Sequence, residues 1–209
     1  MSDLSSLAAI AAAFVIVTVS PGPANLGCAS VAMARGRKVG VQFALGLALG
    51  LTVWGLLAAA GMGAVLEASE WALMVLKLLG GAYLLYLAWS SARSAVAPKT
   101  EVVAADGTGR WFYRGLLLNL TNPKAVFAWL AALAVGLDAA DGLGMVAIAT
   151  AICAVIGVLN YLGWAFVFST QRMMAVYLRV RRWIDGAVAA LFAAAGLGLI
   201  RSALARSPG

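Results

Sequence analysis

The amino-acid sequence predicts an all-α membrane protein with six transmembrane helices. Of its 209 residues, 64% are apolar and 11% are charged, whereas a soluble globular domain usually carries about 25% charged residues. The apolar residues form six long runs, and a helix needs about 20 such residues to cross the hydrocarbon core of a bilayer. Basic residues gather in alternate connections between these runs. Together these features argue against a soluble fold.

The six predicted spans follow one another with few residues between them. Trp71, Trp89, Trp111 and Trp183 fall near their ends, as expected of the aromatic belt at a membrane surface. No Ser-rich, Pro-rich or acidic segment interrupts the series, so we expect a single integral membrane domain over residues 1–209. The predicted spans are residues 4–34, 39–61, 71–92, 111–136, 143–169 and 183–204.

The first apolar run differs from a cleavable signal peptide. Asp3 is the only charged residue before Pro21. A signal peptide would show a basic n-region and a small-residue cleavage site, and the sequence shows neither. We therefore expect this run to be retained as the first span.

The connections between spans differ in charge. The first, third and fifth hold eleven basic residues, whereas the second and fourth hold acidic residues and no basic one. Since short connections rich in Lys and Arg stay in the cytoplasm, we expect a protein of the cell inner (cytoplasmic) membrane with both termini outside. The same rule explains the formal charge of +7 without a nucleic-acid partner. The basic residues are Arg35, Arg37, Lys38, Arg93, Lys99, Arg110, Arg114, Arg172, Arg179, Arg181 and Arg182.

The longest connection divides the chain into two groups of three spans, residues 1–97 and 111–209. Residues 98–110 hold Pro98, Gly107 and mixed charges, a composition typical of a flexible linker, here expected in the cytoplasm. Because each group has an odd number of spans, two related halves have to be inverted relative to each other, which is a common plan of transporters.

The first span of each half carries a predicted break. Pro21-Gly22-Pro23 interrupts the first span, and Asn122-Pro123 interrupts the fourth. Proline removes a backbone donor and clashes with the preceding turn. Backbone groups freed inside a membrane have to be buried in protein or line a wet cavity, and paired broken helices indicate a transport site. The alternative is a pair of kinks needed only for packing.

The break motifs belong to a larger set of motifs along the chain: Ser20-Pro21-Gly22-Pro23, the series Gly36, Gly40, Gly46 and Gly50, Gly80-Gly81-Ala82-Tyr83-Leu84, Gly115 with Asn119-Leu120, and Asn122-Pro123-Lys124-Ala125. With these motifs the chain resembles a known family, the lysine exporter (LysE) superfamily, and within it the homoserine/threonine exporter (RhtB) branch. The resemblance implies a secondary-active inner-membrane exporter of an amino acid or closely related small metabolite, driven by proton exchange.

The candidate substrate-binding residues lie at the breaks and on the fifth span. Lys124 is the one basic residue expected near the middle of the bilayer, where a charge costs roughly 2.5–3.5 kcal/mol. Its ammonium either snorkels toward the cytoplasm or faces a central cavity and attracts a substrate carboxylate. The candidates are Pro21, Gly22, Pro23, Asn25, Asn122, Pro123, Lys124 and Asn160.

Other functions receive less support from the sequence. Two cysteines, Cys28 and Cys153, leave a transmembrane thiol or electron carrier open, but neither adjoins a break. A divalent-metal exporter would need histidines or clustered carboxylates, and the chain has no histidine. We expect no enzymatic activity, no cofactor and no metal site.

Two further features have both a structural and a functional interpretation. We expect Asp185 to form a salt bridge with Arg181 and Arg182 at the cytoplasmic edge, which leaves proton coupling to rest on the resemblance alone. The spacing Gly36-x-x-x-Gly40 and Gly46-x-x-x-Gly50 lets helices approach closely. It indicates packing within the chain or a contact in a homo-oligomer.

Overall fold

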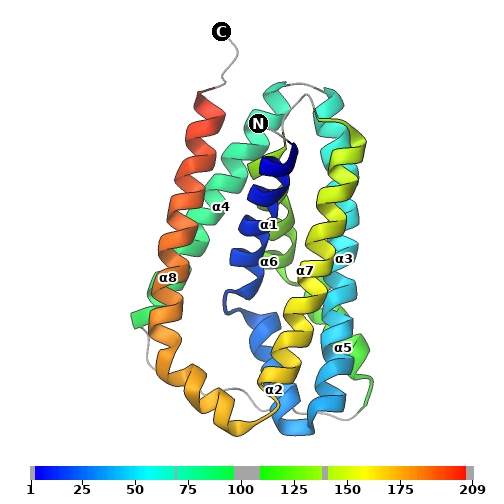
Figure 1. The fold of residues 1–209 in the computed structure, drawn as a ribbon, viewed down its shortest axis with the longest axis vertical. Coiled ribbons are helices and arrows are strands. Elements are labelled where there is room, and N and C mark those ends of the chain that lie inside the picture. The colour runs from blue at the N-terminus through cyan, green and yellow to red at the C-terminus, as the bar shows by residue number, and fades with distance from the viewer. Residues whose placement is uncertain (1–2, 69, 97–108, 138–140, 206–209) are drawn as a thin grey trace.

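The structure is a computed structural model that describes residues 3–68, 70–96, 109–137 and 141–205 (Figure 1). Within these residues the chain forms α-helices and no strand. The helices are α1 (Asp3–Val19), α2 (Pro23–Arg35), α3 (Arg37–Ala68), α4 (Glu70–Val96), α5 (Trp111–Leu120), α6 (Pro123–Gly136), α7 (Leu143–Val167) and α8 (Gln171–Leu204).

The predicted membrane-spanning pattern is confirmed. In the described ranges, α3, α4, α7 and α8 each contain a stretch long and apolar enough to cross a membrane. α1 with α2 and α5 with α6 pass the same test as pairs, and they are bent by 55° and 59°. If each bent pair is one span, the chain has six spans by length and composition, and the first and fourth are the broken ones.

The two halves run through the bundle in opposite directions (Figure 1). In this view α1 and α2 descend, α3 rises and α4 descends, whereas α5 and α6 rise, α7 descends and α8 rises. The beginning of α1 and the end of α8 therefore lie at the same end of the bundle. This is the inverted arrangement predicted from the sequence. Of the expected linker, residues 98–108 lie outside the described ranges.

Small residues bring α3 against α5. A Cβ atom added at Gly46 would overlap the backbone of α5 at Phe112, and one added at Gly115 would overlap the backbone of α3 at Phe43. Gly40 packs in the same way on α2. Backbones that approach this closely leave no room for a side chain. Gly40, Gly46 and Gly50 therefore serve packing within the chain. Gly36 does not, because it lies between α2 and α3 with a φ of +83° and no atom lies within 4 Å of an added Cβ.

α4 and α8 also cross closely where a glycine of each helix faces the other. A Cβ atom added at Gly81 would lie 3.0 Å from the Gly196 carbonyl oxygen, and one added at Gly196 would lie 2.9 Å from the Gly81 carbonyl oxygen. The close crossing holds the last span of each half side by side, which places α8 against α4 beside the helix breaks.

α8 is longer than the sequence predicted. It begins at Gln171, whereas the expected span begins at Trp183, so the basic segment between them is helical. Arginine is a good helix former, and Arg181 forms an ion pair with Asp185 one turn later. The basic residues of the expected fifth connection therefore lie on a helix that continues into the last span.

Candidate functional site

The first break replaces lost helical hydrogen bonds with side-chain ones. Pro21 has no N–H to offer the Val17 carbonyl, and the Ser20 hydroxyl donates to that carbonyl instead at 2.7 Å. Asn25 Nδ2 donates to the Thr18 carbonyl at 2.7 Å and to the Ser20 carbonyl at 3.1 Å. Buried carbonyls need such partners, so Ser20 and Asn25 stabilise the interruption between α1 and α2.

The second break is stabilised in a related way. Asn122 caps α6, because its side-chain oxygen accepts from the Lys124 backbone N–H at 3.1 Å. That N–H would otherwise serve the Leu120 carbonyl, which accepts from Trp54 Nε1 at 3.2 Å. Pro123 occupies the first position of the helix, where its missing N–H costs little. The Asn122 cap, Pro123 and one hydrogen bond from Trp54 of α3 therefore stabilise this break.

Lys124 connects the second break to the first. Its Nζ donates to the Ser20 carbonyl at 2.8 Å and to the Ser20 hydroxyl, and it lies 3.5 Å from the Pro21 carbonyl oxygen. Gly22 makes room for this contact, since an added Cβ atom would lie 3.2 Å from Nζ. The ammonium thus sits at the C-terminal end of α1, where the helix dipole is negative. A role of Lys124 in binding a substrate stays a prediction.

The two breaks share the wall of a cavity of about 450 Å³. α4 and α8 complete the wall, and its hydroxyl groups come from Ser20, Ser90, Ser91 and Ser94 as well as two tyrosines. A second cavity, of about 20 Å³, lies against α3 and Tyr161 of α7. Gly22, Asn122 and Lys124 line both cavities.

The structure brings most of the candidate residues together. The larger cavity is lined by six of them, and Asn25 lines the smaller one. Asn160 reaches the group indirectly, because its Nδ2 donates to Asn25 Oδ1 at 3.1 Å. The six are Pro21, Gly22, Pro23, Asn122, Pro123 and Lys124.

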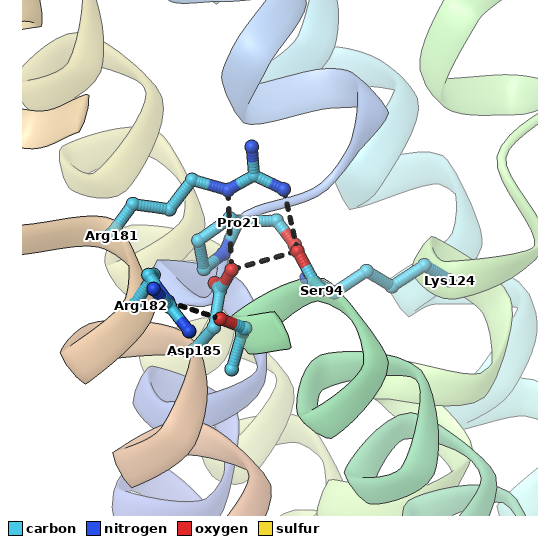
Figure 2. Close-up of polar contacts among 7 residues, drawn as sticks. Pro21, Ser94, Lys124, Arg181, Arg182 and Asp185 are labelled. Carbon is cyan, nitrogen blue, oxygen red and sulfur yellow. Dashed lines mark hydrogen bonds and ion pairs between the residues drawn. The ribbon is translucent and has the colours of Figure 1, made fainter. Parts of the chain in front are cut away.

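Asp185 and Arg181, which the sequence predicted at the cytoplasmic edge, line the same cavity. Figure 2 shows their contacts. Asp185 is 2% exposed. Its Oδ2 lies 3.2 Å from Arg181 Nε and accepts from the Ser94 hydroxyl at 2.7 Å. The expected pairing with Arg181 is confirmed. The pairing with Arg182 is wrong, because Arg182 Nε donates to the Ala95 carbonyl at 2.9 Å.

Two other polar residues near the site were not among the candidates. Asn119 is fully buried, and its Nδ2 donates to the Leu47 carbonyl at 2.6 Å and to the Tyr161 hydroxyl at 3.1 Å. The signal for Asn119 was its place in the resemblance, but nothing local in the sequence connects it to Tyr161. Both residues tie α5 and α7 to α3 beside the smaller cavity.

The cysteines are buried and unpaired. Cys28 on α2 lies 3.5 Å, through its sulfur, from the Tyr161 carbonyl oxygen, and Cys153 lies on α7. Within the described ranges no group of three or more His, Cys, Asp or Glu residues is arranged to hold a metal ion. The larger cavity is lined by apolar side chains, such as Leu26, Leu87 and Phe192, together with hydroxyl, amide and charged groups.

Comparison with known proteins gives matches along almost the whole chain. The model of the LysE type translocator family matches residues 15–203. A threonine efflux protein of Escherichia coli (strain K12) is 34% identical over 205 residues, 92% of this chain and 96% of the relative. One of Salmonella typhimurium is 32% identical over 206 residues, with the same coverage. A homoserine/homoserine lactone efflux protein of Salmonella typhimurium is 33% identical over 119 residues, 56% of this chain and 57% of the relative. No solved structure matches the chain.

Proposed function

The chain belongs to the LysE type translocator family, and we propose that it is a secondary-active exporter that moves an amino acid out through the cytoplasmic membrane. The observation that carries the proposal is the cavity of about 450 Å³ at which the two helix breaks meet. Small-molecule sites commonly measure about 300–1,000 Å³. Broken helices at matching places in two inverted halves are typical of a transporter's substrate site.

The proposed substrate is L-threonine or an amino acid of similar size. Two relatives that match nearly the whole chain, from Escherichia coli and Salmonella typhimurium, bear the name threonine efflux protein. The hydroxyl groups of Ser90 and Ser91 in the cavity wall can both donate and accept hydrogen bonds. Such groups suit a small polar side chain.

The substrate carboxylate would bind near Lys124 and the beginning of α2. Lys124 supplies a positive charge at the junction of the two breaks. The first turn of α2, which starts at Pro23, carries the positive end of a helix dipole. The Lys124 ammonium has three donors, so it can bind a substrate carboxylate while it keeps its hydrogen bond to the Ser20 carbonyl. Rocking of the two inverted halves around this point would open the cavity to either side.

Proton exchange is the proposed driving reaction. The cavity wall holds the ionisable side chains of Lys124 and Asp185. Ionisable side chains inside membrane transporters commonly mark proton pathways. We propose that protons enter the cell as the amino acid leaves. We also propose that the first, third and fifth connections face the cytoplasm.

Efflux from intact cells tests the proposal. Cells that express the chain are preloaded with a panel of labelled amino acids, and the loss of each label is followed. We expect L-threonine to leave faster than from cells with an empty vector. If every amino acid of the panel leaves the expressing cells and the empty-vector cells at the same rate, the proposed export is contradicted. A proton ionophore should slow export. Export that continues unchanged would contradict proton coupling but not export itself.

A further inference from the structure

Among the described residues that line the larger cavity, Asp185 is the one carboxylate. It lies on α8, is 2% exposed, and shares the wall with Lys124 and Arg181. Burying a carboxylate costs free energy unless donors surround it. Its place in the wall of a transport cavity therefore needs a structural or functional reason.

Both described contacts of this carboxylate use the same oxygen. Arg181 Nε and the Ser94 hydroxyl donate to Oδ2, at 3.2 Å and 2.7 Å. Arg181 Nη2 also donates to the Ser94 hydroxyl at 2.7 Å, which closes a triangle of three groups. An ionised carboxylate has acceptor sites on both oxygens. Oδ1 thus keeps its capacity to accept from a further donor.

The backbone acceptors at the first break already have donors. Lys124 Nζ and Asn25 Nδ2 both donate to the Ser20 carbonyl, and Asn25 Nδ2 also donates to the Thr18 carbonyl. A substrate ammonium carries three donors and a positive charge. To bind at the break it would have to displace one of these side chains. Asp185 offers an acceptor oxygen and a full negative charge instead.

We propose that Asp185 binds the ammonium group of the amino-acid substrate, an assignment that rests on the proposed function. The ammonium binds at Oδ1, while Arg181 and Ser94 hold Oδ2 and keep the carboxylate oriented. Arg181 balances the charge of Asp185 when no substrate is present. Figure 2 shows the Lys124 side chain extending toward Pro21 and the cluster around Asp185. The carboxylate of the substrate then binds on the Lys124 side of the cavity.

In this arrangement a substrate needs both an ammonium and a carboxylate to bind. A hydroxy acid or carboxylic acid without the ammonium would leave Asp185 unmatched. Sites built to bond a substrate group reject analogues that lack the group far more strongly than sites of purely apolar contact. Asp185 is therefore assigned as a specificity-determining residue.

The test compares L-threonine with 3-hydroxybutyrate, the same molecule without its α-amino group. Each competes with labelled L-threonine for counterflow by protein reconstituted in liposomes. Each is also added to purified protein to measure the rise in Tm that binding causes. For Asp185→Asn, the half-inhibiting concentration of L-threonine should rise about tenfold or more, the loss expected for one charge-assisted hydrogen bond. That of 3-hydroxybutyrate should stay close to its wild-type value.

Three further variants separate binding from folding. Asp185→Asn leaves Arg181 without its anion, which can destabilise the protein, so the double variant R181Q/D185N removes both charges and should show the same loss of preference. Arg181→Gln alone keeps the carboxylate but removes one of the groups that orient it, so it should weaken the preference for L-threonine less than Asp185→Asn does. Asp141→Asn makes the same chemical change outside the cavity lining and is the matched control.

The outcomes distinguish this assignment from the proposed function. If both variants that lack the Asp185 carboxylate still prefer L-threonine over 3-hydroxybutyrate, Asp185 does not bind the ammonium, and amino-acid export stands. A parallel loss of response to both compounds, or failure of both variants to fold, assigns Asp185 a structural role and also overturns the proposal. If the wild type exchanges no amino acid, the proposed function fails, and the assignment fails with it.

Discussion

The Lys124 ammonium donates to the Ser20 carbonyl at 2.8 Å, so that a residue of the second helix break satisfies the backbone of the first, 104 positions earlier in the chain. The contact joins the two inverted halves where each has an interrupted helix. It also places a positive charge in the wall of the larger cavity. A structural contact and a substrate-binding group are therefore combined in one side chain.

Replacing Lys124 with Met should abolish efflux while leaving the protein in the membrane. Methionine keeps an unbranched apolar stem but removes the charge and the donors that reach Ser20 and Pro21. We expect normal abundance on membrane blots and efflux near that of the empty vector. Lys38→Met, at an exposed lysine near the start of α3, is the control and should export normally. Full efflux from Lys124→Met would show that transport does not need this lysine.

Gly46→Ala should destabilise the bundle. The added Cβ atom would overlap the Phe112 carbonyl in α5, and overpacking of this kind costs about 1–3 kcal/mol. We expect a lower Tm in detergent for this variant. Gly163→Ala in α7 is the matched control, because no atom lies within 4 Å of its added Cβ. There the substitution should leave Tm unchanged or raise it, since alanine favours helix by up to about 1 kcal/mol over glycine. Equal Tm values for the two variants would contradict the close packing of α3 on α5.

Accessibility to a membrane-impermeant thiol reagent should report the topology. Single cysteines at Gly36 and Arg179 should resist labelling in intact cells, because we propose that the first and fifth connections face the cytoplasm. A cysteine at Gly142, between α6 and α7, should be labelled. All three positions are exposed in the structure, so burial would not confuse the result. The reverse labelling pattern would show that the protein has the opposite orientation in the membrane.

The double variant Cys28→Ser, Cys153→Ser should export as well per molecule as the wild type. Both thiols are fully buried, and Cys28 lies on α2 while Cys153 lies on α7. In a helix the serine hydroxyl can bond the carbonyl one turn before it, which limits the cost of the change. Efflux is measured and divided by protein abundance. Loss of activity at normal abundance would instead support a thiol or electron carrier.

Most of the fold follows from features that the sequence carries locally. Continuous apolar runs set the spans, and Pro21, Pro23 and Pro123 interrupt two of them, because proline cannot donate the helical hydrogen bond. The beginning of α8 was the main error. Charged residues such as Arg181 suggested a connection, but they continue a helix, since charge marks contact with water and not the end of helical structure.

The candidate site was only partly predictable. Pro-Gly-Pro and Asn-Pro motifs gave the position of the breaks, but no local pattern shows that Lys124 contacts Ser20 or that Asp185 turns toward the same cavity. Those contacts depend on how two inverted halves meet and on the close crossing of α4 with α8 at Gly81 and Gly196. Distant pairings of this kind appear only after the helices are packed.

Counterflow by purified protein in liposomes tests the central claim most directly, because no other transporter is present. Liposomes loaded with an excess of unlabelled L-threonine should accumulate labelled L-threonine from outside, whereas liposomes without protein should not. Unlabelled 1-amino-2-propanol, which lacks the carboxylate, should support little exchange when loaded in place of L-threonine, because Lys124 and the beginning of α2 would have no anion to bind. Accumulation that needs the protein and an amino acid inside is the result we predict. No accumulation with any amino acid of the panel would contradict the assignment as an amino-acid exporter.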